Sequence, residues 1–365
     1  MPATETLPGA AAEEAAEAAE STAPRVGRRG PSVGLLSLAA AGALLLTACA
    51  EAGAGDGDDD GGDGESGAAG GVEIEDDHGT HTLPEDIESV GAFDNRSFRT
   101  LEAFDVELDV AARSLMDEEV HGYAEDEDIL DTGNHREPDF EPVVAAQPDL
   151  VINGQRYSQF YGDIEELLED DAVILEFGEQ GLSENPEAFA EGLIEKTEKL
   201  GEVFGAEDEA QEIVDEFQAE IDRVEAALSG EDSYMGLMTS GGDLGYLAPG
   251  DGRTLGPLFE IFDLDPALSQ EVEDEAHADE ISVEAIAEAN PDWLLVTDRD
   301  ARLDSDDEDY QPAEELIEEN PALQEVTAVQ EGNIVYTSPE MYLTEDIQAY
   351  TEFLRDWADA LEGAD

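Results

Sequence analysis

The chain has 365 residues, and its 96 Asp and Glu against 15 Lys and Arg give a formal net charge of −81 at pH 7. A hydrophobic content of 41% is enough for the cores of two domains of ordinary size. This charge excludes a simple nucleic-acid binder, which needs a basic face, and it argues against binding through an anionic membrane surface. We interpret it as an adaptation to a salty medium, because molar salt shortens the Debye length to about 3 Å and screens the self-repulsion.

The first 48 residues have the layout of a secretory signal. A positive segment (25–29, RVGRR) precedes an apolar stretch (33–46), and the sequence LTAC ends at Cys49. That ending resembles a bacterial lipobox, which implies cleavage before Cys49 and acylation of its thiol. The alternative is one short transmembrane helix with an incidental cysteine, but a span needs about 20 apolar residues. Cys49 is the only cysteine in the sequence, so no disulfide can form within the chain.

Residues 49–71 are dominated by Gly, Asp and other small residues, which cannot bury a core, and they predict a flexible acidic tether. The N-terminal lobe is expected at residues 72–204. It contains the segment EPVVAAQPDLVINGQR at 141–156, where a short amphipathic helix should end before Pro148. A buried strand is predicted directly after this proline, and Arg156 lies just past its end. A second strand is predicted at 172–177 and a helix at 185–204.

A connecting helix is predicted at residues 205–230, because apolar side chains recur there at helical spacing. The C-terminal lobe follows at 231–365, with strands at 234–239, 293–297 and 333–338 and a closing amphipathic helix at 345–361. Because helices and strands alternate in both lobes, we expect parallel sheets. The predicted fold class is α/β, with two parallel-sheet lobes joined by a single long helix that allows little movement between them.

The helix–strand unit occurs twice. Residues 284–299 (EAIAEANPDWLLVTDR) repeat the pattern of 141–156, with Pro-Asp at 291–292 and Arg299 in the place of Arg156. Open α/β sheets bind ligands beyond the carboxyl ends of their strands. We therefore expect each lobe to direct one guanidinium into a shared cleft.

Arg253 fits the same arrangement. It ends a Gly- and Pro-rich loop (245–253) that follows an apolar strand and leads into a helix, a setting in which backbone approaches an anion closely. Three converging guanidiniums would form a positive site in an otherwise negative protein, suited to planar anions. The alternative is that each of these arginines pairs with a nearby carboxylate.

Three segments resemble the class III substrate-binding lipoproteins of ABC importers, in particular those that bind petrobactin and related catecholate ferric siderophores. They are EPDFE with QPDLVINGQR (137–156), APGDGR (248–253) and NPDWLLVTDRDA (290–301). The loop before Arg253 has one residue more than the family pattern. The resemblance spans about residues 72–362 and implies that Arg156, Arg253 and Arg299 bind the ligand.

The same resemblance implies a lipid-anchored receptor on the outer side of the cell membrane, held there by Cys49. It would capture a ferric siderophore and deliver it to an ABC permease with its ATPase subunits. We expect a monomer without a cofactor of its own and without enzymatic activity. In some relatives a His and a Tyr complete the coordination of iron, and these roles would fall on His277 and Tyr342, although the usual Gly-Gln after the His is replaced by Ala-Asp.

Other interpretations remain open. His78 and His81 could form a metal clip, but their segment also matches the ordinary first strand of the family. A receptor for a bare metal ion or for cobalamin is the alternative among binding proteins, and the five scattered His support it poorly. An exported hydrolase is the alternative of a different class, but the sequence has neither a Gly-x-Ser-x-Gly nor a His-Glu-x-x-His motif.

Overall fold

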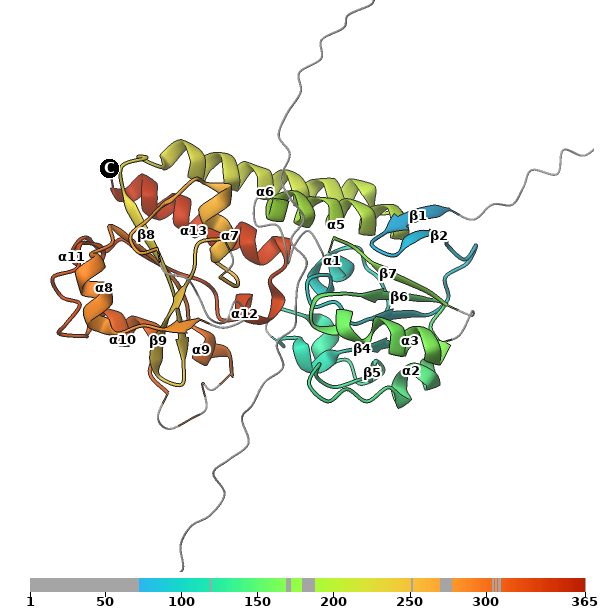
Figure 1. Ribbon diagram of the computed structural model, residues 1–365. Coiled ribbons are helices and arrows are strands. Elements are labelled where there is room, and N and C mark those ends of the chain that lie inside the picture. The colour runs from blue at the N-terminus through green and yellow to red at the C-terminus, as the bar shows by residue number, and fades with distance from the viewer. Residues whose placement is uncertain are drawn as a thin grey trace, which may run out of the picture. The chain divides into compact units, whose positions relative to one another are not determined.

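The computed structural model describes residues 72–364 except 119, 169–171, 179–187, 251, 270–277, 304, 306 and 308–309 (Figure 1). These residues belong to one compact unit, Ser66–Asp365. The predictions for the signal (1–48), for Cys49 with the tether (49–71) and for His277 lie outside the described residues. Within them, we find no helix that combines the length and the apolar character needed to cross a membrane.

The N-terminal lobe is built on a five-stranded parallel sheet in the order β5-β4-β3-β6-β7. Its strands are β3 (Val90–Ala92), β4 (Val110–Ala111), β5 (Leu130–Asp131), β6 (Leu150–Asn153) and β7 (Val173–Glu176). Helices α1 (Phe98–Ala103), α2 (Glu141–Ala146) and α3 (Tyr161–Leu168) belong to this lobe, which a hairpin of β1 (Glu73–Asp76) and β2 (Gly79–Thr82) precedes. The expected parallel sheet is confirmed here.

The C-terminal lobe has a six-stranded sheet in the order β11-β9-β8-β12-β13, with β10 also pairing with β8. Its strands are β8 (Ser233–Ser240), β9 (Asp243–Leu247), β10 (Asp265–Pro266), β11 (Asp279–Glu280), β12 (Trp293–Thr297) and β13 (Ile334–Tyr336). Its helices are α7 (Gly256–Ile261), α8 (Val283–Ala289), α9 (Arg299–Leu303), α10 (Ala313–Glu318), α11 (Thr327–Glu331), α12 (Met341–Thr344) and α13 (Ile347–Ala364).

This second sheet differs from the all-parallel sheet that was expected. Strands β8, β10, β12 and β13 are parallel, but β9 runs antiparallel to β8, and β11 antiparallel to β9. The reason is a two-residue turn between β8 and β9, formed by Gly241 and Gly242 with φ of 64° and 82°. Two successive positive φ values produce a tight hairpin, which glycines adopt without strain.

The repeated Pro-Asp unit has the same structure in both lobes. Helix α2 ends at Gln147 and α8 at Asn290, each in the left-handed conformation with φ of 49° just before the proline. The aspartate after each proline accepts hydrogen bonds from residues at or just before the start of the neighbouring strand. Asp149 Oδ2 accepts hydrogen bonds from the Glu88 and Ser89 amides at 2.9 and 3.0 Å, ahead of β3. In the other lobe, Asp292 Oδ2 accepts from the amide and hydroxyl of Ser233, where β8 begins.

The predicted connecting helix is α6 (Glu207–Ala227), and α5 (Phe189–Phe204) lies antiparallel beside it. Helix α5 reaches Gly205 in a left-handed turn, and α6 returns along it and packs against α13. The start of α5 contributes Phe189 and Leu193 to the core of the C-terminal lobe, whereas its end contributes Leu200 and Val203 to the core of the N-terminal lobe. The boundary expected between 204 and 205 therefore falls at the end of a helix that both lobes share.

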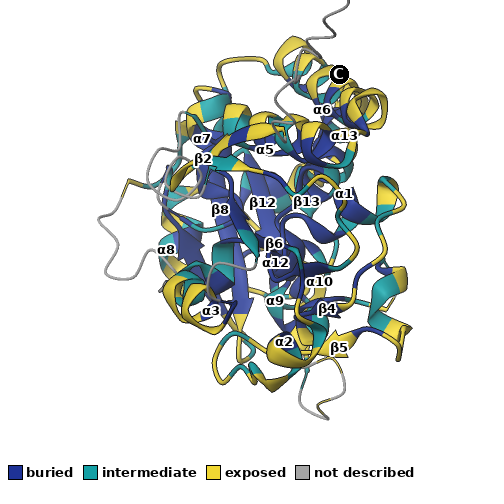
Figure 2. Ribbon diagram, turned by 90° about the vertical axis from the view of Figure 1, so that its right-hand side faces the viewer, coloured by how far each residue is buried: buried dark blue, intermediate teal, exposed yellow. Residues whose placement is uncertain are grey.

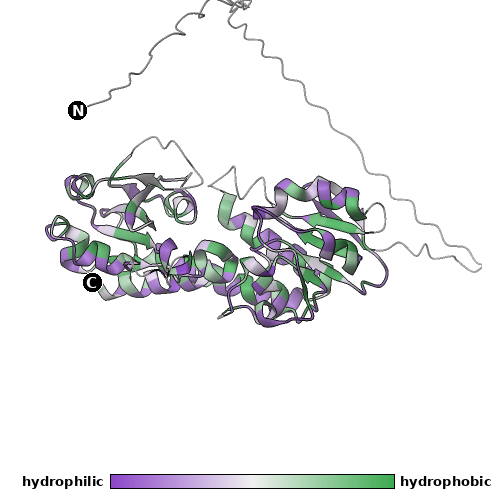
Figure 3. Cartoon of the chain, turned by 90° about the horizontal axis from the view of Figure 1, so that it is seen from below, coloured by the Kyte–Doolittle hydropathy of each residue, from purple (hydrophilic) through white to green (hydrophobic). Residues whose placement is uncertain are grey.

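Burial and hydropathy follow this architecture. In Figure 2 the strands β6, β8 and β12 are dark blue and the edge strand β5 is exposed, while many exposed residues lie along the outer faces of the helices. Figure 3 shows green, hydrophobic strands and helices striped in green and purple. The striping is that of amphipathic helices, which bury one face against a core.

Candidate functional site

The three predicted arginines meet around one aromatic ring. The guanidinium carbons of Arg156, Arg253 and Arg299 lie 5.6, 4.6 and 5.5 Å from the ring centroid of Tyr342. At these distances each guanidinium makes a cation–π contact with the phenol ring. Tyr342 itself is 5% exposed. The structure thus brings four of the five predicted site residues together, and the fifth, His277, lies outside the residues it describes.

The arginines reach this point from both lobes. Arg156 lies in a short 3₁₀ helix, η3 (Gln155–Phe160), directly after β6 of the N-terminal lobe. Arg299 begins α9 just after β12, and Arg253 lies in the loop between β9 and α7. Tyr342 comes from α12, which follows β13. Each arginine therefore follows a sheet strand, and the two repeated units bring Arg156 and Arg299, one from each lobe, to the same tyrosine.

The surroundings of Arg156 disfavour its positively charged form. Its Nη2 donates a hydrogen bond to the Tyr342 carbonyl at 3.0 Å, while its buried Nε has no hydrogen-bond partner among the described residues. Burial, together with the nearby positive charge of Arg253, lowers the pKa of Arg156 to about 10, although Glu345 acts in the opposite direction. The charged form is thus poorly compensated, and an anionic ligand would relieve both deficits.

Arg253 is compensated by a buried carboxylate. Its Nε and Nη2 donate to Oε1 and Oε2 of Glu345, both at 2.9 Å, and Nη2 also donates to the Tyr342 carbonyl at 3.1 Å. Burial lowers the pKa of Arg253, but the ion pair with Glu345 outweighs it and the net pKa is raised. The alternative interpretation, pairing with a carboxylate, is therefore correct for this arginine in the structure.

Arg299 is intermediate between these two. Its Nη1 donates to Asp300 Oδ1 at 3.1 Å and to Ser240 Oγ at 3.4 Å. Asp300 is held in turn by the Gly242 amide, which donates to its Oδ2 at 2.9 Å. The Nε of Arg299 is buried and has no hydrogen-bond partner within the described part of the chain. One face of this guanidinium is therefore paired while one donor stays unsatisfied.

The sequence did not single out three further residues at this site. Glu345 is 1% exposed, and Arg253 with Arg96 and Arg156 lowers its pKa to about 2 against the effect of burial. Arg96 lies 3.9 Å from Glu345. His135 has its pKa lowered to about 4 by burial and by Arg156, so its imidazole is neutral at pH 7. No local motif marks these positions, because their partners are distant in sequence.

The two lobes also meet beside this cluster. Arg302 of α9 forms an ion pair with Asp117 of the N-terminal lobe at 2.9 Å and donates to the Met116 carbonyl at 3.2 Å. A cavity of about 470 Å³ lies along this seam. Its lining comes from both lobes: Met116, Asp117, Glu118, Ala301, Arg302, Ser305, Pro339 and Glu340. Several of these residues are close in sequence to Arg299 or Tyr342.

The two N-terminal histidines are bound to neighbouring acids. His78 Nε2 lies 2.7 Å from Glu176 Oε2, and its ring stacks on Tyr161 with 3.7 Å between centroids. His81 Nε2 lies 2.9 Å from Asp76 Oδ1, within the β1–β2 hairpin. These contacts favour the structural interpretation of both histidines. Within the described ranges, no three His, Cys, Asp or Glu gather in a group that could hold a metal ion.

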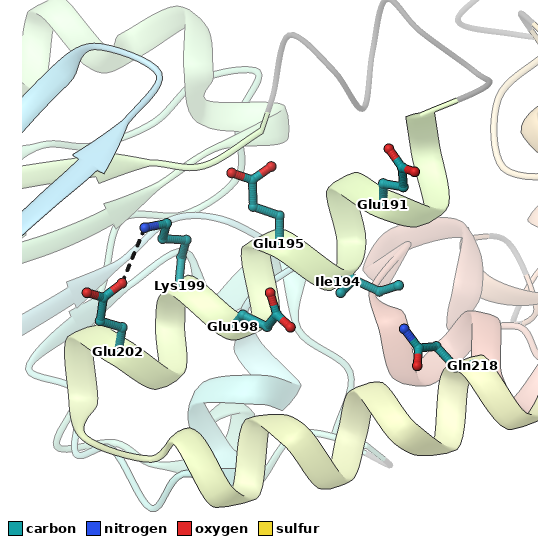
Figure 4. A pocket seen from close by; sticks show the side chains of 7 residues that line it. All are labelled: Glu191, Ile194, Glu195, Glu198, Lys199, Glu202 and Gln218. Atoms are coloured by element: carbon teal, nitrogen blue, oxygen red, sulfur yellow. Dashed lines mark hydrogen bonds and ion pairs between the residues drawn. The ribbon is translucent and has the colours of Figure 1, made fainter. Parts of the chain in front are cut away.

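A second pocket lies on α5 and α6, away from the predicted residues (Figure 4). It is lined by Glu191, Ile194, Glu195, Glu198, Lys199, Glu202 and Gln218. Lys199, the one cation of this lining, pairs with Glu202 at 3.2 Å. The surplus of carboxylates makes this pocket unsuited to an anion.

Known proteins resemble this chain over both lobes. The family model described as periplasmic binding protein matches residues 90–341. Petrobactin-binding protein YclQ of Bacillus subtilis is 25% identical over 294 residues, which cover 79% of this chain and 86% of that protein. Ferric-anguibactin-binding protein FatB of Vibrio anguillarum is 25% identical over 271 residues, 74% of this chain and 81% of the relative.

Solved structures agree with the fold. The periplasmic catecholate-siderophore binding protein VctP of Vibrio cholerae superimposes with a TM-score of 0.66 at 22% identity, over 78% of this chain and 98% of VctP. This likeness confirms the predicted two-lobed α/β fold. Because the family model spans well over half of the sequence, the chain belongs to the periplasmic binding protein family.

Proposed function

We propose that this protein is the extracytoplasmic receptor of an ABC importer and that it captures a ferric siderophore of the catecholate type. The observation that carries the proposal is the meeting of Arg156, Arg253 and Arg299 around Tyr342 in a chain of net charge −81. A site of this sign is useful only to an anionic ligand, which the rest of the protein would repel.

The donors suit catecholate chemistry. Each catecholate supplies two anionic oxygens on a planar ring, and a guanidinium offers both a planar fork of N–H donors and a face that stacks on aromatic rings. The unsatisfied Nε atoms of Arg156 and Arg299 are donors that such oxygens would accept from. The cation–π contacts of all three guanidiniums with the Tyr342 ring support an aromatic ligand, because these arginines already accept one aromatic ring as a neighbour.

The relatives support the same ligand class. YclQ is a petrobactin-binding protein, FatB is a ferric-anguibactin-binding protein, and the structural neighbour VctP is a catecholate-siderophore binding protein. We extend this property to the present chain because its own arginines form the appropriate site. Tyr342 would supply a phenolate oxygen to ferric iron, a hard cation, whenever the siderophore leaves coordination positions open. His277 remains a predicted second ligand.

The sequence supplies the rest of the proposal. Acylation at Cys49 would anchor the receptor to the membrane on its outer side, with residues 49–71 as the tether. The bound chelate would pass to the permease without covalent chemistry, so we propose no enzymatic activity. Between the alternatives, the geometry favours a chelate over a bare metal ion, because three guanidiniums would repel a free cation.

Binding measurements test the proposal. A ferric catecholate siderophore, its iron-free form, cobalamin and Zn²⁺ are each titrated in high salt while tryptophan fluorescence is recorded, since Trp293 lies on the strand that leads to Arg299. We expect quenching by the ferric chelate at low concentration. Quenching by Zn²⁺ or cobalamin alone would refute the siderophore assignment.

Substitutions then localise the binding. Arg156→Met and Arg299→Met should each weaken capture of the ferric chelate by at least about tenfold, because a lost charged hydrogen bond costs about 1.5–3 kcal/mol. The matched control is Arg223→Met, which removes an arginine that pairs with Glu220, Asp359 and Glu362 on the helical spine. Equal affinity in all three variants would exclude the assigned roles.

A further inference from the structure

Glu345 occupies an unusual position for a carboxylate. It directly follows α12, three residues after Tyr342, and it is 1% exposed in the interior. Its backbone adopts a left-handed conformation with φ of 44°, which non-glycine residues rarely adopt. A buried and conformationally strained charge is costly, so its neighbours must hold it strongly.

Those neighbours come from both lobes. Arg253 donates two hydrogen bonds to the carboxylate, and the Thr254 hydroxyl donates a third at 2.9 Å. From the N-terminal lobe, Gln155 Nε2 donates at 2.9 Å, and Arg96 lies 3.9 Å away. Gln155 immediately precedes Arg156. The carboxylate therefore binds Arg253 directly, and it also binds Gln155, the residue next to Arg156.

The carboxylate also changes the charge of the cluster. Arg156, Arg253 and Arg299 together contribute three positive charges; Asp300 pairs with Arg299, and the ion pair of Glu345 with Arg253 offsets a second charge. A binding site formed by these arginines alone would favour the most negative chelate available. The presence of a fixed negative charge beside them reduces that preference.

We propose that Glu345 is a specificity-determining residue, which sets the net charge of the chelate that the arginine cluster around Tyr342 binds best. Resting on the proposed function, this inference concerns which members of the siderophore class are selected. Two catecholates around ferric iron leave a net charge of −1, and three leave −3. The ion pair of Glu345 with Arg253 shifts the preference of this cluster toward the less negative chelate.

A double-mutant cycle tests this role. The ratio of association constants for a ferric tris-catecholate and a ferric bis-catecholate is measured by calorimetry in high salt for each protein. Glu345→Gln removes a negative charge, and the ratio should rise by about tenfold or more, since the two chelates differ by two charges. Arg253→Gln removes a positive charge, and the ratio should fall by a similar factor. The double variant restores the charge balance, so its ratio should return to that of the wild type.

A control variant separates the charge of Glu345 from its role in packing. Thr254→Ala removes a hydrogen bond from the same carboxylate without changing its charge, and it should leave the ratio within about twofold of wild type. A purely structural role for Glu345 would weaken both chelates alike in both single variants, and the ratio would then not move in opposite directions. That result overturns the inference.

The proposed function can fail separately. If the wild type binds neither chelate, the siderophore assignment itself is wrong. If the wild type binds and the ratio is the same in all four proteins of the cycle, only the role of Glu345 is wrong. Should Glu345→Gln fold poorly, the comparison of Arg253→Gln with the double variant still decides, because the ratio must rise between them.

Discussion

The two lobes use one backbone arrangement to position an arginine, but they treat the charge of that arginine differently. In the N-terminal lobe, Arg156 donates a hydrogen bond to the Tyr342 carbonyl, and its pKa is lowered. In the C-terminal lobe, Arg299 is bonded to Asp300, and Arg253 is held by Glu345 through two hydrogen bonds. The repeated sequence thus fixes where a guanidinium lies, whereas residues outside the repeat decide how much of its charge is available to a ligand.

The largest expected effect is on stability and separates Arg253 from Arg156. Arg253→Met leaves the Glu345 carboxylate buried without its bidentate partner, and we expect a loss of about 3–5 kcal/mol in the free energy of unfolding. Arg156→Met removes a charge that Arg253 repels, so it should change stability by less than about 1 kcal/mol. Chemical denaturation of both variants in molar salt, followed by circular dichroism, measures the difference. Similar losses in both would show that the two arginines are equally structural.

A smaller effect on stability is expected from the aspartate that follows the proline in each copy of the repeated unit. Asp149→Ala and Asp292→Ala each remove a carboxylate that accepts two hydrogen bonds at the start of a neighbouring strand. Each should lower the free energy of unfolding by about 1–3 kcal/mol, and the two losses should be similar because the geometry is the same. Denaturation curves measured beside those of the arginine variants give the comparison. A loss of stability in only one of the two variants would mean that the two copies of the motif do not contribute equally to folding, although their hydrogen bonds are similar.

Much of the fold could be predicted because the relevant signals are local. The runs at 150–153 and 293–297 are continuous and apolar between a proline and polar residues, and strands β6 and β12 have those bounds. The glycine pair at 241–242 is also a local signal, because it produces the hairpin that makes β9 antiparallel, whereas the alternation of helices and strands predicts only parallel strands. The shared role of α5 depends on which core each turn of the helix enters, which spacing alone does not reveal.

The candidate site was predictable to a similar extent. The arginines could be found because the chain has few cations and because two of them follow repeated strands. Glu345 could not, since it is one of 96 acids and its partners Gln155 and Arg253 are 190 and 92 residues away in sequence. Only tertiary packing distinguishes this carboxylate from the solvated ones around it.

The position of the bound iron tests the central claim most directly. Anomalous X-ray diffraction from crystals of the protein with a ferric catecholate siderophore locates the metal without assumptions about the ligand. We expect one strong iron peak beside the Tyr342 ring, with catecholate oxygens accepting hydrogen bonds from Arg156 and Arg299. A peak elsewhere, such as the acidic pocket on α5 and α6, with both guanidiniums unchanged, would contradict the proposed receptor site.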